Sequence, residues 1–158
     1  MEGAEIEQFI ARSRTATVAT IGPRGLPHLV AMWYAVIDSE IWIETKAKSQ
    51  KVANLRRDGR ASILIEDGFT YDTLRGVALE GTAEISEELD DLWRVGTNMY
   101  ERYTGPYSDD KSALIEGMIH KRVAVRFVPE RTRSWDHRKL AMPETRISGS
   151  TAQFLRRL

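Results

Sequence analysis

The chain has 158 residues, and its 23 Lys and Arg residues balance 23 Asp and Glu residues, so the formal net charge is zero. This length suits one domain with a sizeable core. The balanced charge argues against a bulk nucleic-acid or membrane-surface binder, although a local basic patch is compatible with it. The absence of cysteine excludes disulfides, thiolate nucleophiles and cysteine-ligated zinc or iron–sulfur sites.

The N-terminal stretch, residues 1–11, contains several Glu residues and no apolar segment of the kind found in signal peptides. No window of the sequence approaches the length of a membrane span. We therefore expect a cytoplasmic protein with neither a membrane nor a nucleic acid as its partner.

The first part of the chain is predicted to form one helix and three strands. Ile6, Phe9 and Ile10 share one helical face. The Gly-Pro-Arg-Gly sequence at 22–25 is typical of a turn, and the alternating residues before it predict a hairpin. The expected elements are a helix ending near residue 13 and strands over residues 15–21, 27–37 and 40–45.

A basic loop follows the third strand. Lys46, Lys48 and Lys51 crowd this loop, and Ser49 can cap a short helix whose apolar face includes Val52. Free backbone N–H groups and the helix dipole favour an anion at such a helix start, so the loop could seat a phosphate. A solvated basic turn between two strands explains the same residues, and both interpretations stay open.

The second part of the chain is predicted to add three strands, two helices and a tail. Ser86 is a credible N-cap for a helix, and the sequence Thr104 to Pro106 is expected to end that helix. Asp109 and Asp110 suit the first turn of a second helix. An alternating strand from Arg122 is expected to break at Pro129. The expected elements are strands over 60–65, 71–85 and 122–128, helices over 89–103 and 114–119, one domain over 1–140, and a tail over 141–158 whose Phe154 and Leu155 could dock on a partner.

Common catalytic motifs are missing. No G-x-S-x-G, G-x-G-x-x-G or P-loop sequence follows a strand, which argues against hydrolase and nucleotide-binding folds. His28, His120 and His137 lie too far apart for metal-ligand spacing, so no metal site is expected. No protein nucleophile or acid–base pair stands out. If the protein is an enzyme, a bound cofactor should carry the chemistry.

The order of several short motifs resembles the pyridoxamine 5′-phosphate oxidase-like split β-barrel flavoproteins, including their deazaflavin (coenzyme F420) reductase branch. The resemblance implies a mainly β fold, a six-stranded antiparallel split β-barrel with peripheral helices. It also implies a homodimer with cofactor sites at its interface. The motifs are Thr17-Val18-Ala19-Thr20, Gly25-x-Pro27-His28, the strand Trp42 to Thr45, Ser49-Gln50-Lys51, Asn54 to Asp58, Val77 to Ala83, and Pro129-Glu130-Arg131 with Trp135.

The resemblance assigns cofactor-binding roles position by position. Lys51 matches the basic residue on the cofactor phosphate, and Thr45 ends a strand that reaches the cofactor tail. Trp135 matches an aromatic residue near the ring that comes from the other subunit. Arg75 lies next to the position of a glutamine that contacts the ring in the oxidases. The remaining candidates are Lys46, Ser49 and Gln50 in the loop, and Val30, Ala31, Met32 and Trp33 on the strand along the ring.

Ordinary structural roles compete with these assignments. Trp33 and Trp135 could be core or interface aromatics, residues 30–32 would be apolar in any barrel strand, and Lys51 could be a surface lysine. The catalytic residues are left unassigned.

The chain departs from the oxidases at three places. His28 occupies the position of an arginine that binds the flavin phosphate, and Gln50 precedes Lys51 where the oxidases have a second arginine. An Arg-x-His substrate motif after Trp135 is missing. These departures, and the extra lysines Lys46 and Lys48 for a longer anionic tail, favour the deazaflavin branch. The expected function is hydride transfer between coenzyme F420 and a small planar or conjugated organic substrate. The alternatives are an FMN-dependent oxidoreductase, a non-catalytic flavin- or haem-binding module, and a dimer with an empty groove.

Overall fold

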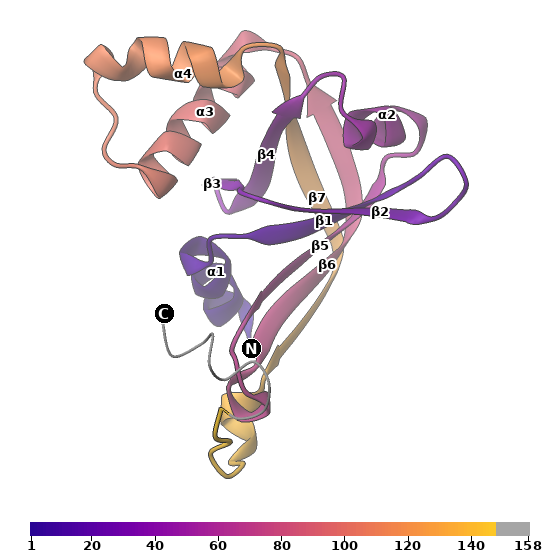
Figure 1. Cartoon of the computed structure of the whole chain (residues 1–158), viewed down its shortest axis with the longest axis vertical. Helices are drawn as coiled ribbons and strands as arrows, with labels where there is room; N and C mark the ends of the chain where they lie inside the picture. Colours follow the sequence, from indigo (N-terminus) through magenta and orange to yellow (C-terminus); the bar gives the residue numbers. More distant parts are fainter. Residues whose placement is uncertain (148–158) are drawn as a thin grey trace.

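The computed structural model describes residues 1–147, which form a single curled antiparallel sheet of seven strands with peripheral helices (Figure 1). The strand order is β2-β1-β5-β6-β7-β4-β3. The strands are β1 (Ala16–Ile21), β2 (Pro27–Met32), β3 (Ala35–Ile37), β4 (Glu40–Lys46), β5 (Arg60–Asp67), β6 (Arg75–Ser86) and β7 (Arg122–Asp136). The helices are α1 (Gly3–Arg12), α2 (Gln50–Arg57), α3 (Leu89–Tyr103) and α4 (Ser112–Ile119). The mainly β split barrel expected from the sequence is confirmed.

The strand count is seven rather than six, because the segment predicted as one strand over 27–37 divides at Trp33 and Tyr34 into β2 and β3. The backbone of Tyr34 leaves the sheet: its N–H donates to the Tyr103 hydroxyl at 3.1 Å, and its carbonyl accepts from the same hydroxyl at 2.9 Å. The fully buried Tyr34 side chain donates in turn to the carbonyl of Ile10 at 2.6 Å. These contacts hold the backbone where the chain passes from β2 at one edge of the sheet to β3 at the other edge.

The prediction that β7 breaks at Pro129 is wrong, since β7 continues to Asp136. Beyond Phe127 the strand no longer pairs with β4, so the missing N–H of Pro129 can face an open edge. A register shift between Glu80 and Gly81 gives the longer strand one extra residue at this point. The bulge therefore allows β7 to continue beyond Pro129.

Three smaller expectations are corrected. Residues 71–73 form a 3₁₀ turn, and β6 begins only at Arg75. The cap of α3 is Glu88, whereas Ser86 bonds the Asp91 carboxylate at 2.6 Å. Asp109 and Asp110 lie in a 3₁₀ turn before α4 instead of in its first turn.

The core has two parts, one on each side of the curled sheet. Inside the curl, alternate side chains of β1, β4, β5, β6 and β7 pack together with Phe9 of α1. On the other side, α3 and α4 cover Trp42 and Ala124 of β4 and β7. The second cluster places both helices at one end of the molecule, whereas α1 lies beside the opposite ends of β5 and β6 (Figure 1).

The chain after β7 lies along the turn that precedes β6. The N–H of Thr145 donates to the Asp72 carboxylate at 3.1 Å. Residues 148–158, including the predicted docking residues Phe154 and Leu155, lie outside the described part of the chain. None of the helices within residues 1–147 is long and apolar enough to cross a membrane.

Candidate functional site

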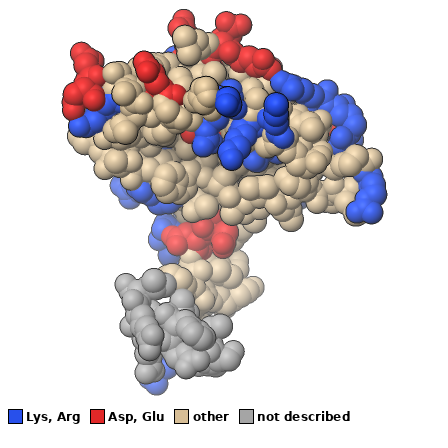
Figure 2. Space-filling view, turned by 45° about the horizontal axis from the view of Figure 1, so that its top comes forward, with Lys and Arg blue, Asp and Glu red and all other residues tan. Residues whose placement is uncertain are grey.

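The basic loop between β4 and α2 has the local structure predicted from its sequence. Ser49 is the N-cap of α2, and its hydroxyl accepts from the N–H of Val52 at 3.5 Å. Val52 and Leu55 are buried and anchor the helix on the sheet. Lys and Arg side chains gather on the side of the molecule that carries α2 (Figure 2). The start of α2 thus lies in a basic part of the surface.

Three of the predicted cofactor-binding residues form one bonded cluster. The Lys51 Nζ donates to the Thr45 Oγ1 at 2.8 Å, and the Thr45 and Ser49 hydroxyl oxygens lie 3.4 Å apart. Burial lowers the pKa of Lys51, and the nearby Arg122 charge lowers it further. Within the described part of the chain this half-buried ammonium lies beside another cation and bonds only a neutral hydroxyl, and such a group is suited to bind an anion.

Arg122 is a neighbour that sequence reasoning did not find. It pairs with Lys46 across β4 and β7, and its Nη1 lies 3.8 Å from the Glu44 Oε1. Glu44 is buried, and its Oε2 has no hydrogen-bond partner among residues 1–147. Burial raises the pKa of Glu44, and the Arg122 charge opposes this rise. Arg122 therefore faces one incompletely bonded carboxylate, whereas the neighbouring Lys51 bonds a neutral hydroxyl.

The side chains of the other two candidates, Lys46 and Gln50, make no hydrogen bond to this cluster within residues 1–147, although the Lys46 carbonyl accepts from the Ser49 N–H at 2.9 Å. Lys46 is exposed at the end of β4. Gln50 is turned along α2, where its Nε2 donates to the Asn54 Oδ1 at 2.8 Å. The fully buried Asn54 donates to the Thr20 hydroxyl at 3.0 Å and so ties α2 to β1.

His28 lies opposite Thr20 in the β1–β2 pair. Its Nδ1 is buried and has no hydrogen-bond partner within the described chain. This buried Nδ1 on β2 is a further polar group to which a bound molecule could form a hydrogen bond.

The strand predicted to lie along the cofactor ring is the edge strand β2. Val30 and Met32 are half-buried and Ala31 is exposed, as the alternation of a strand requires. Trp33 follows the strand and stacks on Tyr103, with ring centroids 4.3 Å apart and planes within 3°. The Trp33 side chain is nevertheless 54% exposed, so it offers a fixed aromatic surface next to an unpaired strand edge.

Trp135 and Arg75 lie at the other end of β7. Arg122 begins this strand and Trp135 is its penultimate residue, so the two are separated by roughly 40 Å along the strand at about 3.3 Å per residue. Trp135 pairs with Gly76 and covers it with its indole ring. Arg75 bonds Asp67 at 2.6 Å instead of any residue of the loop. One chain alone does not bring these two residues to Lys51.

These residues fit an anionic cofactor better than a metal ion. No group of three or more His, Asp or Glu side chains within residues 1–147 is arranged to hold a metal. The cluster at α2 instead offers a lysine, two hydroxyls and a capped helix start, which together suit a phosphate.

Comparisons with known proteins identify the family and support the fold. The family described as pyridoxamine 5′-phosphate oxidase matches residues 3–136. The conserved hypothetical protein Rv2991 from Mycobacterium tuberculosis is 64% identical, with a TM-score of 0.93 over 96% of this chain and 94% of that one. An F420 reductase (22% identity, TM-score 0.64, 84% of this chain and 98% of that one) and HutZ, the haem storage protein from Vibrio cholerae (18%, 0.65, 84% and 92%), share the fold. No curated protein sequence matches significantly.

Proposed function

Because the chain belongs to the pyridoxamine 5′-phosphate oxidase family, we propose that it is an oxidoreductase that transfers a hydride between bound coenzyme F420 and a small planar or conjugated organic substrate. The observation that best supports the proposal is the environment of the Lys51 ammonium. Its ammonium is half-buried, has the Thr45 hydroxyl as its one hydrogen-bond partner among residues 1–147, and lies beside the Arg122 charge. Such a group gains a charge-assisted hydrogen bond when an anion arrives.

The residues of the chain act in this proposal by binding and orienting. Lys51, Thr45 and Ser49 hold the cofactor phosphate, and Lys46 and Lys48 attract the anionic tail. The backbone of β2 and the stacked Trp33 lie along the ring and fix its plane. The deazaflavin supplies the hydride chemistry when bound. The protein contributes proximity, since the substrate is held flat against one face of the ring.

The proposal includes a homodimer with a composite site. The outer face of the sheet carries a row of neighbouring side chains from β2, β1, β5 and β6 that are uncharged and mostly small. This row consists of Ala31, Thr17, Leu64 and Ala78. Trp135 lies on the same face, because Gly76, which it covers, is two residues from Ala78. A second copy on this face would bring its Trp135 to the site that one chain cannot complete.

A Leu64→Glu substitution is expected to dissociate the dimer. Leu64 is 37% exposed at the centre of the outer face, and two buried carboxylates facing each other in the dimer would be strongly unfavourable. Light scattering after size-exclusion chromatography measures the mass. The matched control is Leu114→Glu, because Leu114 is an exposed leucine of α4 that is not part of this row. A Leu64→Glu protein with an unchanged dimeric mass, or a wild-type monomer, contradicts this part of the proposal.

A Lys51→Ala substitution is expected to weaken cofactor binding by about 1.5–3 kcal/mol, which is a loss of about tenfold to a hundredfold in affinity. The measurement is a fluorescence titration with coenzyme F420 and, in parallel, with FMN. Lys111→Ala is the control, since Lys111 pairs with Asp110 at the start of α4, outside the loop. Equal affinities of the Lys51→Ala and wild-type proteins would remove the assignment. A wild-type preference for FMN would move the protein to the flavin-dependent alternative.

A non-catalytic flavin- or haem-binding module is the second candidate. It is favoured by the shared fold with a haem storage protein and by the lack of any acid–base pair in the loop. A turnover experiment distinguishes the oxidoreductase from the binding module. The bound ring is reduced chemically and a nitroaromatic or quinone acceptor is added. Reoxidation faster than that of the free cofactor supports the enzyme, whereas no acceleration with any acceptor supports the binding module.

A further inference from the structure

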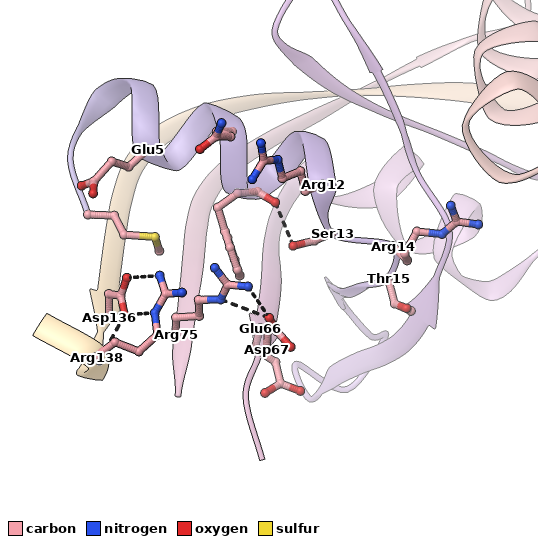
Figure 3. Close-up of a pocket in the computed structure, with 13 residues that line it drawn as sticks. Glu5, Arg12, Ser13, Arg14, Thr15, Glu66, Asp67, Arg75, Asp136 and Arg138 are labelled. Carbon is pink, nitrogen blue, oxygen red and sulfur yellow. Dashed lines mark hydrogen bonds and ion pairs between the residues drawn. The ribbon is translucent and has the colours of Figure 1, made fainter. Parts of the chain in front are cut away.

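A cavity lies between α1 and the ends of β5, β6 and β7 (Figure 3). It is separate from the cluster around Lys51 at the start of α2. Its volume is about 410 Å³, which is in the range of sites for small organic molecules. Arg75 of β6 and Arg138, which follows β7, reach into it from one side, and Arg12 of α1 borders it from the other.

The sheet register builds one side of this cavity. Asp67, Arg75 and Asp136 are direct neighbours on β5, β6 and β7. They form the next row after Ile65 and Val77 on the inner face, at the point where the apolar core ends. The row is therefore charged, and α1 covers it without filling it.

Two carboxylates hold the two arginines in fixed orientations. Arg75 donates from Nε at 3.0 Å and from Nη2 at 2.6 Å to Asp67, and Arg138 donates from Nε at 2.8 Å and from Nη2 at 2.6 Å to Asp136. The Asp136 side chain is only 2% exposed, and Arg138 lowers its pKa to about 2. Neither arginine uses its Nη1 for a hydrogen bond within residues 1–147. Each guanidinium thus keeps one edge for a ligand.

The remaining lining favours a ligand with a negative charge and a flat apolar part. Three of the four lining carboxylates are already paired: Asp67 with Arg75, Asp136 with Arg138, and Glu5 with Lys139 at 2.7 Å. The fourth, Glu66, lies on the opposite face of β5 from Asp67. Glu66, Arg12 and Arg14 have no ion pair in the described part of the chain, so the unpaired lining side chains have a positive charge in excess. The buried Phe9 ring forms an apolar wall, and the Arg75 guanidinium lies 5.1 Å from its centroid.

We propose that this cavity binds a small organic carboxylate with a planar apolar body. The carboxylate is held by the free edges of Arg75 and Arg138 with help from the Arg12 charge, and the apolar body packs on Phe9 and Met1. Arginine recognises carboxylates through paired N–H groups, and prior fixation of its side chain lowers the entropic cost of binding. No residue of the Lys51 cluster lines this cavity, and the test relies on Arg12 and Arg138, because Arg75 is also a predicted cofactor-binding residue.

The test is a calorimetric titration of the full-length protein with benzoate, and with benzamide as the uncharged molecule of the same shape. Benzoate is expected to bind at least about tenfold more tightly than benzamide, as one charge-assisted hydrogen bond implies. Arg138→Gln is expected to remove this difference. Arg12→Gln, which breaks no ion pair and so keeps the fold intact, is expected to reduce it severalfold.

Arg60→Gln is the matched control. Arg60 donates from Nε and Nη2 to Asp58 in the same manner, but it lies outside the cavity. This variant should bind benzoate like the wild type. Circular dichroism checks that every variant is folded. No benzoate binding, equal binding of benzamide, or identical affinities in Arg12→Gln and the wild type would each overturn the proposal.

Discussion

The Gly81→Ala variant is expected to be less stable than the wild type by about 3 kcal/mol. A Cβ atom at Gly81 would lie only 2.1 Å from the carbonyl oxygen of Val128 and 3.1 Å from the N of Glu130. These are backbone atoms of the paired strand at the bulge, so neither can turn aside as a flexible side chain would. Urea denaturation followed by circular dichroism measures the free energy of unfolding.

Gly117→Ala is the control for the glycine replacement. Gly117 is an exposed residue of α4, and no atom lies within 4 Å of a Cβ built there. Alanine in a helix interior is favoured over glycine by about 1 kcal/mol, so this variant should be slightly more stable than the wild type. If Gly81→Ala proves as stable as Gly117→Ala, the close approach of β6 and β7 at the bulge is refuted.

The Asn54→Ala variant is expected to lose about 2 kcal/mol of stability. The Asn54 side chain is fully buried, and its Nδ2 is the donor to the Thr20 hydroxyl, which is also buried. Removing the amide leaves that hydroxyl without its partner from α2. Since α2 carries Lys51, the same variant should also weaken cofactor binding in the titration described above.

A double substitution provides the control for this interaction. Replacing both polar partners with apolar side chains removes the unsatisfied group, so Thr20→Val combined with Asn54→Leu should recover most of the lost stability. Gln50 and Arg57, which also donate to Asn54, are exposed and can bond water instead. Full additivity of the two single substitutions would show that Thr20 and Asn54 do not interact.

The sequence predicted the parts of the fold that depend on local patterns. The alternation of β1, the apolar face of α1 and the Ser49 cap of α2 were each read correctly, because neighbouring residues determine them. The break of the strand at Trp33 and Tyr34 was missed, since it depends on hydrogen bonds to Tyr103, about 70 residues away. The continuation of β7 through Pro129 was missed for the same reason: the glycine that permits it belongs to β6.

In the candidate site, too, residues close in the sequence were predicted together, whereas residues brought together by strand pairing were not. Thr45 at the end of β4, Ser49 and Lys51 at the start of α2 are close in the sequence, and the structure joins them by hydrogen bonds. Arg122 approaches them only through the pairing of β4 with β7. The cavity under α1 could not be anticipated either, because its arginines and carboxylates come from α1 and the segment after it, from β5, β6 and β7, and from the turn after β7, which are far apart in the sequence. The cofactor roles of Val30 to Trp33, Arg75 and Trp135 stay predictions.

The position of β7 in the sheet also constrains when the protein can fold during its synthesis. Strands β2, β1, β5 and β6 form one ladder, β4 and β3 form another, and β7 alone joins them. Until residue 136 has emerged from the ribosome, the facing edges of β4 and β6 both lack a partner. Open edges of this kind invite pairing between chains. A nascent chain should therefore stay prone to aggregation until late in translation, and truncation before β7 should yield insoluble protein rather than a smaller domain.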